Sequence, residues 1–80
     1  MESTINMSLD AMAEGIASRI AAIQAPPTEI DRLEVMGLCV GRTVEVVKSG
    51  DPMIVRVLGT RLGLAAVLAR TVLVEAEPAG

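Results

Sequence analysis

The chain has 80 residues, of which 51% are apolar, and it contains no aromatic residue and no histidine. A chain of this length forms one small domain, and its core must be built from aliphatic side chains. Seven basic and ten acidic residues give a net charge of −3, which argues against the basic surface of a nucleic-acid-binding domain.

The cellular location follows from the cysteine count and from the hydropathy of the chain. The single cysteine excludes an intrachain disulfide, and this is typical of a reducing compartment. The longest nearly apolar run, 62–74, is interrupted by Arg70 and is shorter than the roughly 20 residues that a bilayer requires. We therefore expect a cytoplasmic protein without direct membrane insertion, which reaches the inner membrane only through a partner.

The first elements expected along the chain are a short helix and a strand. Ser8 is placed to cap a turn of helix over 9–13, and a strand is expected over 16–25. Ile20 and Ile23 are three positions apart rather than two. The spacing predicts a β-bulge near residues 21 and 22 or a bend in the strand.

The next element is a helix near 28–36. The two prolines at 26 and 27 end the strand, and Thr28 is the expected N-cap. Ile30, Leu33 and Met36 recur at three-residue spacing. They predict one buried stripe along this helix.

Two glycines separate this helix from the strands that follow. Gly37 is placed to adopt the left-handed conformation that ends many helices, and Leu38 would then pack on Leu33. Gly41 is expected to form a second tight turn, which directs the chain into the sheet.

The second half of the chain is predicted to be mostly strand. Alternating apolar residues predict strands over 43–47, 53–58 and 61–64, then a short helix near 65–70 and a last strand over 71–75. The predicted fold is therefore mainly β. We expect a small SH3-like β-barrel of about five strands, with the short N-terminal helix and the helices near 28–36 and 65–70.

The order of these motifs resembles the bacterial FeoA family over residues 7–75. The stretches "RLEVMGLCVG" and "GDPMIVRVLGTRLGL" carry the resemblance. Its motif residues are Leu33, Met36, Gly37, Leu38, Gly41, Gly50, Asp51, Pro52, Gly59, Leu62 and Leu64. The resemblance implies an SH3-like accessory protein of ferrous iron uptake that binds the membrane ferrous iron transporter FeoB, whose cytoplasmic part contains a G-protein domain.

The resemblance also divides the chain. Residues 1–6 would be an N-terminal extension, 7–75 the FeoA-like domain and 76–80 a flexible tail. The sequence departs from the family pattern at Thr60, where relatives commonly have an aromatic residue. It departs again at 65–68, where apolar residues replace the charged residues that are common in relatives.

Enzymatic chemistry is not expected. The chain lacks histidine and tyrosine for acid–base catalysis, and it lacks a P-loop for nucleotide binding. We predict no catalytic residue, no cofactor and no metal site, since ferrous sites favour histidine and thiolate ligands. The arginines that could serve a partner's GTPase are Arg32, Arg42, Arg56 and Arg61. The carboxylates that could give weak oxygen coordination are Glu29, Asp31, Glu34, Asp10 and Glu14.

Partner binding is the function that the residue pattern favours. If alternate residues of the strand over 53–58 face the core, the others face outward and can be joined by side chains of the last helix. The predicted partner surface consists of Ile54, Arg56, Leu58, Val67 and Leu68. In the alternative interpretation, Leu68 closes the barrel, and Ile54 and Leu58 lie under the N-terminal helix.

Three other functions stay open at this point. The same apolar surface could form a homo-oligomer. The chain could also be a detached regulatory domain, akin to the SH3-like C-terminal domain of iron-dependent repressors. A modulator of the transporter's GTPase is the third alternative.

Overall fold

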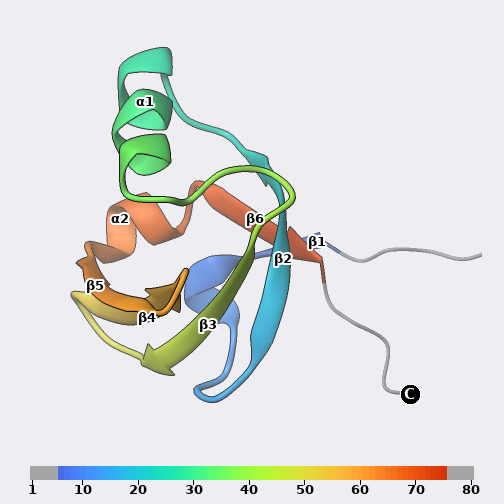
Figure 1. The fold of residues 1–80 in the computed structure, drawn as a ribbon, viewed down its shortest axis with the longest axis vertical. Helices are drawn as coiled ribbons and strands as arrows, with labels where there is room; N and C mark the ends of the chain where they lie inside the picture. The colour runs from blue at the N-terminus through green and yellow to red at the C-terminus, as the bar shows by residue number, and fades with distance from the viewer. Residues whose placement is uncertain (1–5, 76–80) are drawn as a thin grey trace, which may run out of the picture.

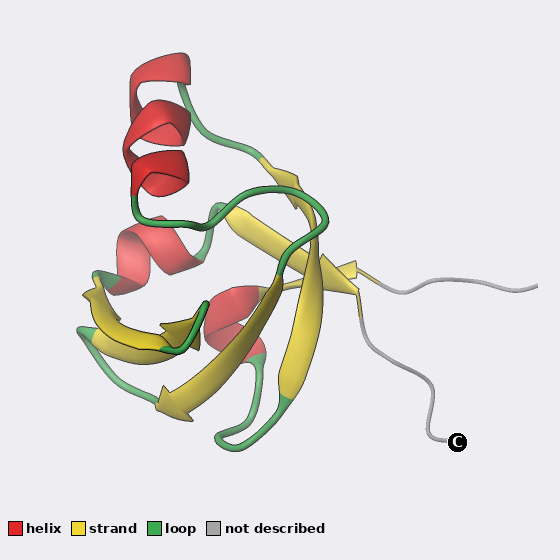
Figure 2. Ribbon diagram, in the orientation of Figure 1, coloured by secondary structure: helices red, strands yellow, loops and turns green. Residues whose placement is uncertain are grey.

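The computed structural model describes residues 6–75, which form one curved six-stranded antiparallel sheet with three short helices (Figures 1 and 2). The strands are β1 (Asn6–Ser8), β2 (Ala17–Ile23), β3 (Thr43–Lys48), β4 (Met53–Val57), β5 (Thr60–Leu64) and β6 (Val72–Glu75). The helices are the 3-10 helix η1 (Leu9–Ala11), α1 (Pro27–Val35) and α2 (Ala66–Ala69). The strand order is β1-β6-β2-β3-β4-β5, so β1 and β5 are the edge strands.

The predicted fold class is confirmed: the chain is mainly β, with few helices and an SH3-like arrangement. The sheet has one strand more than expected, because β1 pairs with β6 through three residues. Three residues are too few for an alternating pattern to reveal a strand. Apart from Asn6, the predicted extension 1–6 and the predicted tail 76–80 lie outside the described residues.

The N-terminal helix is shorter than predicted. It is a single 3-10 turn, and Ser8 occupies the N-cap position without a side-chain capping hydrogen bond. The turn is held by packing instead, because Leu9 is fully buried in the core. The capping role predicted for Ser8 is therefore wrong.

The bulge predicted in the first long strand is confirmed. The pairing of β2 with β6 shifts register between Ile20 and Ala22. The extra residue lets Ile20 lie in the core while Ile23 packs against it, although their spacing does not fit a regular strand.

The start of α1 differs from the prediction, because Pro26 rather than Thr28 is the N-cap. The Pro26 carbonyl accepts hydrogen bonds from the N–H groups of Glu29 and Ile30 at 2.9 and 3.0 Å. Pro27 is the first helical residue, where a missing N–H costs nothing and a fixed φ suits the helix. Proline geometry therefore sets this helix start without a capping side chain.

Helix α1 ends at a left-handed glycine, Gly37, as predicted. Gly37 has a φ of +96° and donates to the Glu34 carbonyl at 2.9 Å, while Leu38 donates to the Leu33 carbonyl at 2.9 Å. This pair of bonds is a Schellman motif. Leu33 and Leu38 are both fully buried, so the motif anchors the end of the helix to the core of the sheet.

The core is aliphatic, as the composition predicts. The inward positions expected in the valine-rich strands are confirmed. The buried apolar residues are Leu9, Met12, Ile20, Leu33, Leu38, Val44, Val46, Met53, Val55, Val57, Leu64, Ala69, Val72 and Val74.

Asp51, in the loop between β3 and β4, caps α2. Its Oδ1 accepts a hydrogen bond from the Ala66 N–H at 3.1 Å, and Ala66 is the first residue of that helix. We expect Asp51→Ala to lower the free energy of unfolding by about 1 kcal/mol, the usual loss for a missing helix cap. Urea denaturation checks this, with Asp51→Asn as the control that keeps an accepting oxygen. Equal losses for the two variants would contradict the capping role.

Candidate binding cleft

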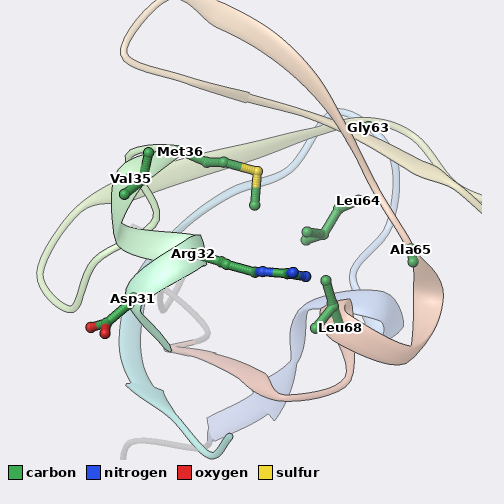
Figure 3. Close-up of a pocket in the computed structure, with 8 residues that line it drawn as sticks. All are labelled: Asp31, Arg32, Val35, Met36, Gly63, Leu64, Ala65 and Leu68. Carbon is green, nitrogen blue, oxygen red and sulfur yellow. The ribbon is translucent and has the colours of Figure 1, made fainter. Parts of the chain in front are cut away.

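The candidate functional site is an apolar cleft between α1 and the segment formed by β5 and α2 (Figure 3). Its volume is about 510 Å³, which is the size range of small-molecule and side-chain pockets. The lining residues are Asp31, Arg32, Val35, Met36, Gly63, Leu64, Ala65 and Leu68.

The wall of the cleft is made of aliphatic side chains from both segments. Met36, Leu64 and Leu68 point into the space between the helices (Figure 3). Met36 and Leu68 also pack against the core, and Leu64 belongs to it. The wall is thus a partly exposed extension of the hydrophobic core.

Two charged residues line the cleft, and they point in different directions. The Arg32 side chain extends across the cleft towards Leu68, whereas the Asp31 carboxylate points away from it (Figure 3). Within residues 6–75 the ion pairs join Arg56 to Glu45 and Arg70 to Asp10, so Arg32 has no ionic partner there. The cleft is therefore apolar with one unpaired cation.

Each wall of the cleft is held by a local feature of its own. The Schellman motif places Met36 at the end of α1, next to the buried Leu38. On the other side, the Asp51 cap holds the first residue of α2. These contacts define where the two walls of the cleft end and begin along the chain.

The five predicted partner residues differ in their location and in their exposure to solvent. Leu68 lines the cleft, and Val67, its neighbour in α2, is 65% exposed. Leu58 lies in the β4–β5 turn and is 70% exposed. Ile54 is half-buried, and Arg56 is bonded to Glu45 at 3.0 Å across β3 and β4.

Leu58 lies close to the end of α1. A β-carbon at Gly37 would be 3.5 Å from the Leu58 Cδ1, and Gly37 directly follows Met36 of the cleft wall. Leu58 has a φ of +54°, which is unusual for a leucine. We use the term cleft surface for the lining residues Val35, Met36, Leu64 and Leu68 together with two exposed residues outside the lining, Leu58 and Val67.

The sequence reasoning missed Arg32 and Val35 as residues of the site. Val35 is 88% exposed and lines the cleft. The available signal was an apolar residue beside the predicted stripe of Ile30, Leu33 and Met36. That stripe is buried only at Leu33, because Ile30 and Met36 are half-buried, so the prediction of one buried stripe is wrong at its two ends.

Two of the other polar candidates make structural contacts. Asp10 pairs with Arg70 at 3.6 Å, and Glu14 accepts a hydrogen bond from the Ser49 N–H at 2.8 Å. In the part of the chain that the structure describes, no three histidine, cysteine, aspartate or glutamate residues group together to hold a metal ion. Within residues 6–75, no helix is both long and apolar enough to span a membrane.

The fold and the cleft define a small SH3-like β domain with an apolar cleft on its surface. The model of the FeoA domain family matches residues 7–76. The chain therefore belongs to the FeoA family, as the order of its motifs predicts. A search of curated proteins found no match to the chain.

Solved structures of FeoA proteins are similar to the chain. The crystal structure of an iron uptake regulatory protein, FeoA, has 29% sequence identity and a TM-score of 0.85, and the match covers 89% of this chain and 97% of that one. The FeoA protein from Chlorobium tepidum has 26% identity and a TM-score of 0.80, over 86% of this chain and 69% of that chain.

A larger regulatory protein has the same fold in part of its chain. A manganese-dependent transcriptional repressor matches with a TM-score of 0.85 and 16% identity. The match covers 95% of this chain but 44% of the repressor. At this identity the likeness concerns the fold alone.

Proposed function

We propose that the protein is a non-enzymatic accessory protein of bacterial ferrous iron uptake, which acts in the cytoplasm by binding the cytoplasmic part of the transporter FeoB. The observation that carries the proposal is the FeoA family match over residues 7–76. It is supported by the similar FeoA structure that is named an iron uptake regulatory protein. Association with the inner membrane would then be peripheral and would depend on the transporter.

The cleft surface supports a role in protein binding. Val35, Leu58 and Val67 are large apolar side chains that are 88, 70 and 65% exposed. Exposed apolar side chains beside a cleft mark protein-binding surfaces more often than ordinary surface. The division into an extension (1–6), a binding domain (7–75) and a tail (76–80) is part of this proposal.

Leu58→Asp is expected to weaken binding of the transporter's cytoplasmic part at least tenfold and to leave the fold intact. The side chain is mostly exposed, and aspartate tolerates the positive φ at this turn better than most residues. A charge in an apolar contact loses its hydration without gaining a partner. Isothermal titration calorimetry measures the affinity, and circular dichroism monitors the fold.

Thr60→Asp is the matched control, because this exposed residue lies two positions further in the same hairpin and is already polar. Its affinity should stay close to that of the wild type. Equal affinities for all three proteins would remove Leu58 from the partner surface. Sedimentation of the same variants tests self-association through this surface.

The proposed role in iron uptake is tested in cells. A strain that lacks the gene is expected to take up radioactive ferrous iron more slowly, and the wild-type gene should restore the rate. The Leu58→Asp gene, expressed at the same level, should restore it poorly. Unchanged ferrous uptake in the deletion strain would contradict the proposal.

A detached regulatory domain is the second candidate, favoured by the similarity in fold to part of the manganese-dependent repressor. It predicts binding to a separate DNA-binding protein and no effect on the transporter. A modulator of the transporter's GTPase is a form of the first proposal. It predicts that the rate of GTP hydrolysis by the transporter changes when the protein is added, and that Arg42→Ala or Arg61→Ala removes the change.

A further inference from the structure

We propose that the cleft takes an extended segment of a partner protein, which pairs with the free edge of β5 as an added strand and places a carboxylate on Arg32. The inference rests on the proposed function, since it names the kind of partner segment that the cleft surface binds. The backbone of β5, the side chains of the cleft wall and the charge of Arg32 each support it.

The outer edge of β5 has unpaired backbone groups. β5 is an edge strand of the sheet, with β4 as its neighbour. The two strands form a hairpin in which Val57 lies opposite Thr60. Both turn residues, Leu58 and Gly59, have positive φ, as in the two-residue turns whose flanking residues exchange both hydrogen bonds. Bonded and non-bonded pairs alternate from there along the strands.

This alternation decides which groups of β5 are free. Thr60, Leu62 and Leu64 bond to β4, whereas Arg61 and Gly63 lie at the intervening positions, opposite Arg56 and Ile54. The N–H and C=O of Arg61 and Gly63 therefore point away from β4. Gly63 also lines the cleft, so one of these free positions opens onto the apolar space.

An extended segment matches this geometry. A strand added beside β5 would lie in the cleft and turn alternate side chains towards Met36, Leu64 and Leu68. A helix in the same place would cover the N–H and C=O of Gly63 without bonding to them. Buried unpaired backbone groups are unfavourable, so the edge selects a strand.

Arg32 adds a charge requirement. Its side chain crosses the apolar cleft, and it has no ionic partner within residues 6–75. A bound segment would remove water from the guanidinium, which is costly unless the segment supplies an anion. A carboxylate suits this role because it can accept two parallel hydrogen bonds from arginine.

The test begins without an assumed partner. A phage-displayed library of random heptapeptides is selected on the full chain, and the enriched peptides are synthesised. We expect them to alternate aliphatic or β-branched residues with others and to carry at least one aspartate or glutamate. Selection of no peptide, or of peptides without an acidic residue, would overturn the inference.

Two glycine variants separate strand pairing from simple apolar contact. Gly63→Pro removes an N–H that points to the free edge and does not bond to β4, and proline is tolerated at such edge positions. Gly63→Ala keeps the N–H, and the added β-carbon would meet its nearest neighbour, the Pro52 Cβ, at an ordinary 3.7 Å. We expect Gly63→Pro to weaken peptide binding at least tenfold and Gly63→Ala to change it less than threefold.

The charge is tested with Arg32→Glu against the same peptides. We expect at least a tenfold loss, with partial recovery when the peptide's acidic residue is replaced by lysine. NMR titration of the isotopically labelled full chain should place the largest amide shifts at Gly63, Leu64 and Ala65. Equal affinities for Gly63→Pro, Arg32→Glu and the wild type would overturn the inference, provided that each variant gives a folded spectrum.

Three further outcomes are distinguishable. If the wild-type chain dimerises in sedimentation experiments and Gly63→Pro abolishes the dimer, the occupant is a second copy and the inference is wrong. If the transporter's cytoplasmic part binds the wild type, Gly63→Pro and Arg32→Glu equally, the inference fails and the proposed function stands. If the peptides bind as expected but the transporter does not, the proposed function fails. The inference that the cleft binds an extended segment with a carboxylate then stands.

Discussion

Replacing Leu33 with alanine is expected to lower the free energy of unfolding by about 3 kcal/mol. Leu33 is the residue of α1 that is fully buried in the core, and its loss removes apolar contacts and leaves a cavity. An 80-residue domain has a total stability of roughly 5–10 kcal/mol. The variant should therefore unfold at a much lower urea concentration, measured by circular dichroism.

Val35→Ala is the matched control, two residues further along the same helix. Val35 is 88% exposed, so its truncation should change the stability by no more than about 0.5 kcal/mol. Similar losses in the two variants would mean that α1 does not pack on the sheet as described. Leu33→Ala should also weaken partner binding, because α1 forms one wall of the cleft.

Gly37→Val is expected to lower the free energy of unfolding by about 2 kcal/mol. The backbone at Gly37 has a φ of +96°, which a β-branched residue adopts only with strain. The new β-carbon would also lie 3.5 Å from the Leu58 Cδ1, and the valine methyl groups beyond it would require that side chain to move. Urea denaturation measures the loss.

Gly63→Ala provides the glycine control, because Gly63 lies in β5 and does not have a positive φ. It should change the stability by less than about 0.5 kcal/mol, the usual range for surface changes. If Gly37→Val were equally well tolerated, the Schellman motif would not be what ends α1. The family motif would then need another explanation at this position.

The elements that the sequence predicts well are those set by short-range patterns. Val44 and Val46 lie two positions apart in one strand, where they alternate with polar residues, and they are buried as expected. Gly37 follows a three-residue stripe and ends the helix as expected. The spacing of Ile20 and Ile23 indicated the bulge. In each case the neighbouring residues carry the necessary information.

The start of α1 shows where local rules compete. Thr28 is a better capping residue than Pro26 by side-chain chemistry, but Pro27 has the φ of a first helical residue and needs no N–H partner. The helix therefore begins two positions earlier than it would with Thr28 as its N-cap. Here the backbone preference of proline overrides the capping preference.

The cleft could not be predicted in the same way, because its walls are far apart in the sequence. Arg32 lies in α1, whereas Leu64 and Leu68 lie more than 30 positions later. On a helix pattern alone, Arg32 is an ordinary solvent-facing charge. Only the tertiary arrangement brings it over an apolar wall, where it gains a binding role in our proposal.

The central claim is that this FeoA-family chain acts by binding the transporter through the cleft surface. Calorimetric titration of the full chain with the cytoplasmic part of FeoB tests it most directly, using Val35→Asp, whose side chain lines the cleft, and Val40→Asp, an exposed valine that does not. We predict a saturable complex that Val35→Asp weakens at least tenfold and Val40→Asp leaves nearly unchanged. No measurable binding, or equal binding by both variants and the wild type, would contradict the claim.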